Sequence, residues 1–167
     1  MKTVVWALLA AVALAAPTAV SARDVHIGAL TISGAWSRPT PPGAPTAVGY
    51  LTITNHGPAP DRLVGAESPA ATSLTLHSMS MTGGIMRMRP MPEGLVIPPG
   101  ASVSLDPTGY HLMFEGLNHQ LQSGDHVFAT LHFEHAGLAM IIFYVGDGPK
   151  PAPAPMGGMD MGEMKMN

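Results

Sequence analysis

The 167-residue chain contains no cysteine. That absence excludes thiolate metal sites, thiol redox chemistry and cysteine nucleophiles, and it means that no disulfide supports the fold. It also excludes a blue-copper electron-transfer centre, which needs a cysteine thiolate beside two histidines. In place of cysteine the chain carries 13 methionines and 8 histidines. A site for a soft metal ion would therefore have to be built from thioethers and imidazoles.

Basic charge and long apolar runs are also scarce. The formal net charge is -3, which argues against nucleic acid and anionic membrane surfaces as partners, because both call for a basic patch. The apolar run Val4–Ala16 is shorter than the roughly 20 residues that span a bilayer. With Lys2 before it and the small residues Val20-Ser21-Ala22 after it, the run predicts an export signal over residues 1–22. We therefore expect a periplasmic protein that does not insert into the membrane after signal cleavage.

Alternation of apolar and polar residues with period two predicts a series of short strands. It is clear in residues 48–54, 73–77 and 127–133, and Pro/Gly-rich turns separate these segments. No segment carries a sustained 3.6-residue apolar period. The pattern predicts one all-β sandwich or barrel over residues 23–146. It stops at a Pro-rich spacer and a Met-rich tail, and we expect residues 147–167 to be disordered without a ligand.

Methionines cluster in the middle of the chain, at Met79, Met81, Met86, Met88 and Met91. His77 precedes the cluster, and His111 and Met113 follow it after turns. A thioether is a soft ligand that is not protonated near neutral pH, and together with imidazole it favours copper, especially Cu(I), over zinc, magnesium or calcium. A lone methionine usually fills a gap in a core. The hypothesis of a copper site therefore rests on the cluster, and composition leaves open which members are bystanders.

Strand geometry gives several of these residues a common face. Side chains at positions i and i+2 of a strand point the same way, so His111 and Met113 share a face. Met86 and Met88 share a face opposite Ile85. The side chains of His77, Met88, His111 and Met113 can then meet at one end of the sandwich. In the apolar run from residue 138 to residue 144, we predict that Met140 belongs to the core.

Four segments strongly resemble the periplasmic copper chaperone family of the PCu(A)C type: residues 61–65, 77–90, 94–100 and 107–117. The resemblance extends from about Val25 to Val145 and implies a cupredoxin-like β-sandwich. The family motif is a histidine and a methionine with ten residues between them, followed by a distant His-x-Met. By resemblance, the metal ligands are His77, Met88, His111 and Met113.

One departure from the family pattern is visible. The 22 residues between Met88 and His111 are one more than the family motif has. Because the flanking segments match on both sides, we expect the extra residue in the turn that starts at Met91. A turn insertion changes a loop and leaves the strand registers unchanged. Met91 is therefore a weaker candidate ligand than the four motif residues.

The resemblance implies a copper carrier and not an enzyme. It would hold Cu(I), with Cu(II) as a further option, in a partly exposed site of two histidines and two methionines, and would release the ion by ligand exchange. The implied acceptor is the CuA centre of a cytochrome c oxidase subunit, or its assembly factor, and we expect a monomer. Sequestration of copper for resistance, with no dedicated acceptor, uses the same ligands and stays open. No nucleophile elbow or other catalytic signature surrounds the serines and histidines.

The tail holds a second group of methionines: Met156, Met159, Met161, Met164 and Met166. Three or more thioethers on a flexible chain can close around Cu(I), so a second copper site is one hypothesis and a solubilising tail is the other. The remaining histidines are isolated from the motif, and we expect them at the surface or in turns: His26, His56, His119, His126, His132 and His135.

Overall fold

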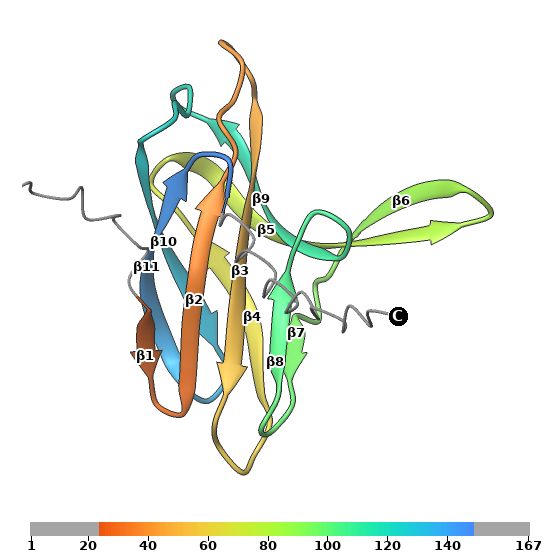
Figure 1. Cartoon of the computed structure of the whole chain (residues 1–167), viewed down its shortest axis with the longest axis vertical. Helices are drawn as coiled ribbons and strands as arrows, with labels where there is room; N and C mark the ends of the chain where they lie inside the picture. The colour runs from red at the N-terminus through yellow and green to blue at the C-terminus, as the bar shows by residue number, and fades with distance from the viewer. Residues whose placement is uncertain (1–23, 149–167) are drawn as a thin grey trace, which may run out of the picture.

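The computed structural model describes residues 24–148. The predicted signal segment (1–22) and most of the predicted tail, including all its methionines, lie outside the described residues. The strands are β1 (Val25–Ile27), β2 (Leu30–Ser37), β3 (Thr46–Asn55), β4 (Asp61–Glu67), β5 (Ala71–Thr82), β6 (Ile85–Pro90), β7 (Leu95–Ile97), β8 (Ser102–Leu105), β9 (Tyr110–Leu117), β10 (His126–Phe133) and β11 (Gly137–Val145) (Figure 1). Within residues 24–148 there is no helix, and hence none that could cross a membrane.

The strands close on themselves into a barrel. Pairing runs from β5 to β9, β3, β2, β11, β10 and β4, and β4 pairs back with β5 where Ala66 faces Leu74. In this ring only β2 and β11 pair in parallel. The other strands extend the barrel: β1 on β2, β7 on β4, β6 on β5, and β8 against β3 and β9. This arrangement confirms the predicted all-β class.

Alternation along each strand decides which side chains form the core. In β10 and β11 every second residue is buried, including Leu131 and Phe143, which are fully enclosed. Phe143 meets the ring of Phe114 from β9 edge to face, with centroids 5.5 Å apart. Burying a large apolar side chain contributes about 1.5–3 kcal/mol. The barrel interior therefore fixes β9, which carries two of the predicted ligands.

The prediction that Met140 lies in the core is wrong. Its side chain is 79% exposed, because β11 points Met140 and Ile142 outward and Ala139 and Ile141 inward. A continuous apolar run is typical of a strand buried on both faces. In β11 only one face meets the core, and apolar side chains also occupy the outer face. Periodicity could not reveal this, because both faces of the strand are apolar.

A tight turn joins β6 to β7, at the position where we expect the extra residue relative to the family motif. The N–H of Gly94 donates to the carbonyl of Met91 at 3.0 Å. Gly94 has a φ of +76°, and a Cβ atom there would lie 2.3 Å from the carbonyl oxygen of Leu63 in β4. The turn therefore needs glycine both for its backbone conformation and for its close approach to β4.

Gly94→Ala is expected to lower the free energy of unfolding by clearly more than Gly100→Ala. Gly100 also has a positive φ, of +67°, but a Cβ there meets nothing within 4 Å. Gly100→Ala should cost only the strain of a left-handed backbone, about 1–2 kcal/mol. Gly94→Ala should cost this strain and also the collision of the new Cβ atom with the carbonyl oxygen of Leu63. Urea denaturation of the two variants measures the difference. Equal losses would contradict the close packing of this turn on β4.

Candidate metal centre

β5 and β9 lie side by side and carry three of the four predicted ligands. Their register sets His77 opposite His111 and Met113 opposite Thr75. The intervening pair, Leu76 and Leu112, is buried in the core. Because side chains alternate across a strand, His77, His111 and Met113 lie together on the outer face of this part of the barrel. The face shared by His111 and Met113 is the one that the sequence predicts.

Met88 reaches the same place from β6. This strand pairs with the far part of β5, and the two form a hairpin that projects from the barrel (Figure 1). The Nε2 atom of His111 lies 3.2 Å from the Sδ atom of Met88. The rings of His77 and His111 are nearly parallel, with centroids 5.8 Å apart and 15° between their planes. The structure thus brings together side chains from the β5–β6 hairpin and from β9, which lies further along the chain.

The two imidazoles are enclosed and the thioether of Met88 is open. His77 is 8% exposed and His111 is 4% exposed, whereas Met88 is 47% exposed. The site is therefore more enclosed on its histidine side than the partly exposed site that the sequence predicts. Burial lowers the pKa of His111; a hydrogen bond with the backbone of Gly109 raises it, and the proximity of His77 lowers it further. The lowered pKa favours the neutral imidazole, which is the form that binds metal ions.

Polar side chains on the same face orient His77. Its Nδ1 atom lies 3.4 Å from the hydroxyl of Thr75, and that hydroxyl donates to the carboxylate of Glu115 at 3.4 Å. Ser73 donates to the same carboxylate at 3.0 Å. A hydroxyl that donates to Glu115 can accept from Nδ1–H of His77, which leaves the Nε2 lone pair for a metal ion. Sequence reasoning missed Glu115, although its place two residues after Met113 puts it on the ligand face.

The chemistry of the donor set fits copper. Among residues 24–148, no group of three or more His, Asp or Glu side chains is placed to hold a metal ion. A metal ion at this face would therefore bind two imidazoles completed by thioethers. Zinc, magnesium and calcium sites use thiolate, additional imidazole or oxygen ligands, whereas thioethers suit Cu(I).

Other interactions account for Met91 and for most of the remaining histidines. Met91 is partly buried and packs against the edge of the hydrophobic core, which is a common use of methionine. Met79, Met81 and Met86 lie on the projecting hairpin. Other histidines have partners elsewhere: His26 and His56 share the hydroxyl of Thr31, His132 lies 3.6 Å from Glu67, and His135 lies 3.4 Å from Asp61. The tail methionines lie outside the described residues, so a copper site there stays a prediction.

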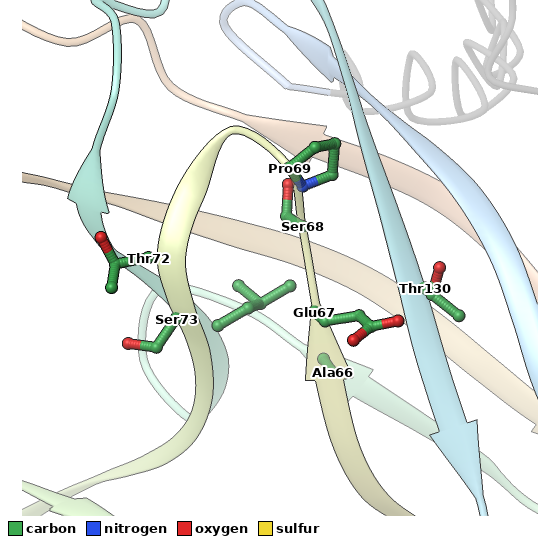
Figure 2. Close-up of a pocket in the computed structure, with 8 residues that line it drawn as sticks. Ala66, Glu67, Ser68, Pro69, Thr72, Ser73 and Thr130 are labelled. Carbon is green, nitrogen blue, oxygen red and sulfur yellow. The ribbon is translucent and has the colours of Figure 1, made fainter.

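A surface hollow of about 600 Å³ lies elsewhere, at the turn between β4 and β5 (Figure 2). Small polar side chains such as Ser68, Thr72 and Thr130 line it, together with the carboxylate of Glu67. No histidine or methionine is among its lining residues. None of the four predicted ligands therefore lines this hollow.

Solved structures share this fold. The copper-bound PCuAC domain from PmoF2 matches with a TM-score of 0.64 and 25% identity, covering 74% of this chain and 97% of that domain. The solution structure of the Cu(I) form of DR1885 from Deinococcus radiodurans matches with a TM-score of 0.55 and 31% identity, covering 74% and 80% of the two chains. Its apo form covers 86% of this chain and 95% of its own, at 29% identity and a TM-score of 0.55.

Comparison of the sequence with known proteins shows the family of this chain. A putative lipoprotein of Leifsonia xyli subsp. xyli (strain CTCB07) is 34% identical over 116 residues, which are 70% of this chain and 69% of that protein. The model of the LpqE-like family, described as putative lipoproteins, matches residues 30–145. Together with the PCuAC structures, these matches confirm the resemblance and the cupredoxin-like class that the sequence indicates. The chain belongs to the LpqE-like family and has the fold of PCuAC domains.

Proposed function

We propose that this protein is a copper carrier that binds one Cu(I) ion through His77, Met88, His111 and Met113. The observation that carries the proposal is the 3.2 Å approach of Met88 Sδ to His111 Nε2, with the His77 ring stacked beside it. As a packing contact, a thioether against an aromatic ring contributes only about 0.3–1.5 kcal/mol. Two buried imidazoles and a thioether on a projecting hairpin are better explained as ligands of one ion. Copper-bound PCuAC structures of the same fold support this assignment.

The proposed ligands differ in exposure, and this difference suits the transfer of Cu(I) to an acceptor protein. Thioethers and neutral imidazoles carry no charge, so bound Cu(I) keeps its positive charge and its affinity stays moderate. Met88 is the open ligand, and an acceptor's donor atom can approach from its side. The copper–Met88 bond then breaks as a bond to the acceptor forms, and the ion remains Cu(I) throughout. His77 and His111 hold the ion until the last exchange.

The family and the predicted export signal support a location, and the resemblance to PCu(A)C copper chaperones suggests an acceptor. A family of putative lipoproteins indicates an extracytoplasmic protein, and the predicted signal over residues 1–22 favours the periplasm. There the protein would act as a monomer, without catalysis, and deliver copper to the CuA centre of a cytochrome c oxidase subunit or to its assembly factor. The tail methionines would provide a second, capturing site.

Sequestration without an acceptor is the second candidate, since it needs the same ligands. The two functions differ in what happens when the loaded protein meets an apo CuA domain. Delivery requires the copper content of the separated acceptor to rise in proportion to the copper that the carrier loses. If the carrier keeps its copper at equilibrium with excess acceptor, the delivery function is refuted and sequestration is supported.

Met88→Leu and Met113→Leu are each expected to weaken Cu(I) binding by more than about tenfold, a change of about 1.4 kcal/mol. Leucine conserves volume, so the free energy of unfolding should change by less than about 1.5 kcal/mol. Competition with a Cu(I) chelator measures the affinity, and urea denaturation measures stability.

Met140→Leu is the matched control for these variants. Met140 is exposed on β11 and lies outside the centre. Its substitution should therefore change neither the Cu(I) affinity nor the free energy of unfolding. An unchanged Cu(I) affinity in both Met88→Leu and Met113→Leu would rule out the ligand assignment.

A further inference from the structure

The hairpin of β5 and β6 carries four methionines on one face. Its register pairs Met79 with Met88 and Met81 with Met86. Directly paired residues of an antiparallel ribbon point to the same side, as do residues two apart on one strand. Met79, Met81, Met86 and Met88 therefore form a single row of thioethers, here named the methionine face. The opposite side carries Ser78 paired with Arg89, Ser80 with Arg87, and Thr82 with Ile85.

Packing does not explain the outer part of the methionine face. Among residues 24–148, β6 contacts β5 extensively and no other strand to a similar degree, and all six of its residues are exposed. Figure 1 shows this hairpin extending away from the barrel. Met81 is 70% exposed and Met86 is 52% exposed. Filling gaps in a core, the common use of methionine, is therefore not their role, and apolar side chains gathered on an exposed surface mark an interaction site.

The methionine face leads directly into the metal centre. His77 lies two residues before Met79 on the same strand and the same face, and it stands opposite His111. Met88 belongs to the row and also contacts His111. Steps of two residues along a strand are about 7 Å, and a methionine side chain has three rotatable bonds with which to shorten that gap. An ion could thus move from the hairpin tip to the imidazoles without leaving sulfur or nitrogen ligands.

We propose that Met79, Met81 and Met86 form a second Cu(I) site of thioethers alone, from which copper enters the His77–His111 site through Met88. The destination of this path rests on the function proposed above. Each step is a ligand substitution. The copper–sulfur bonds to Met81 and Met86 break as the bond to Met88 forms, and the bond to Met79 breaks as the bonds to the imidazoles form. Copper stays Cu(I), and no proton moves, because a thioether and a neutral imidazole bind through lone pairs.

A docking face for an apolar partner is the competing explanation, and the composition of the hairpin argues against it. Leucine or isoleucine would serve such a face as well as methionine. Beyond the pair His77 and Pro90, the paired residues on this side of the hairpin are all methionine, whereas Ile85 lies on the opposite side. Replacing methionine by leucine keeps the apolar surface and removes the sulfur, so it separates the two explanations.

The test is a Cu(I) titration of the full chain labelled with ¹³C at the methionine methyl groups. Each methyl signal is assigned by single Met→Leu substitution, so hairpin, centre and tail are observed separately. The first equivalent of Cu(I) should shift the signals of Met88 and Met113, and further Cu(I) should shift those of Met79, Met81 and Met86. The signal of Met140 should stay in place.

The outcomes separate this inference from the proposed function. Hairpin signals that stay in place while Met88 and Met113 shift would overturn the thioether site and leave the proposed function standing. Hairpin signals that shift without those of Met88 and Met113 would overturn the proposed function, and with it the destination of the path. If the signals of the hairpin and of the centre all stay in place, the thioether site and the proposed function are both overturned.

Kinetics test the path itself. The double variant Met81→Leu/Met86→Leu should load the His77–His111 site from a Cu(I) chelator more slowly than the native chain. Met140→Leu should load at the native rate, because its thioether lies outside the hairpin. A double variant that also loads at the native rate would overturn transfer through the hairpin.

Discussion

The register between β5 and β9 is the constraint on which the candidate metal centre depends. It sets the buried pair Leu76 and Leu112 on one side of the wall and the pair His77 and His111 next to it on the other side. A slip of one residue would turn imidazoles into the core and leucines out of it. Because Phe114 of β9 is fully enclosed against Phe143, the core holds this register. Hydrophobic packing therefore forms the face that carries His77 and His111 without help from a metal ion.

The packed barrel wall and the projecting β5–β6 hairpin meet at this face. The barrel wall supplies enclosed imidazoles, and Glu115 and Thr75 orient one of them. The hairpin supplies thioethers and packs extensively only on its own partner strand among the described residues. Segments with few buried contacts open at low free-energy cost. The wall is thus suited to retain an ion, and the hairpin is suited to exchange its ligands.

Sequence reasoning predicted the strands and the face shared by His111 and Met113, because strand periodicity is local. It was wrong for Met140, where both faces of β11 are apolar and alternation carries no information. It missed Glu115 because its role depends on a cross-strand neighbour. It also missed the single methionine face, although Gly83 and Gly84 mark a two-residue hairpin turn with positive φ at both positions. That turn sets Met81 opposite Met86, and only the register reveals the row.

X-ray absorption at the copper edge tests the central claim most directly. The full chain would be loaded with one equivalent of Cu(I), and the number and type of bound atoms would be measured. The account predicts a mixed shell of two imidazole nitrogens and two thioether sulfurs, and Met113→Leu should reduce its sulfur content. A shell of sulfur alone would place the first copper on methionines away from His77 and His111, and would contradict the account.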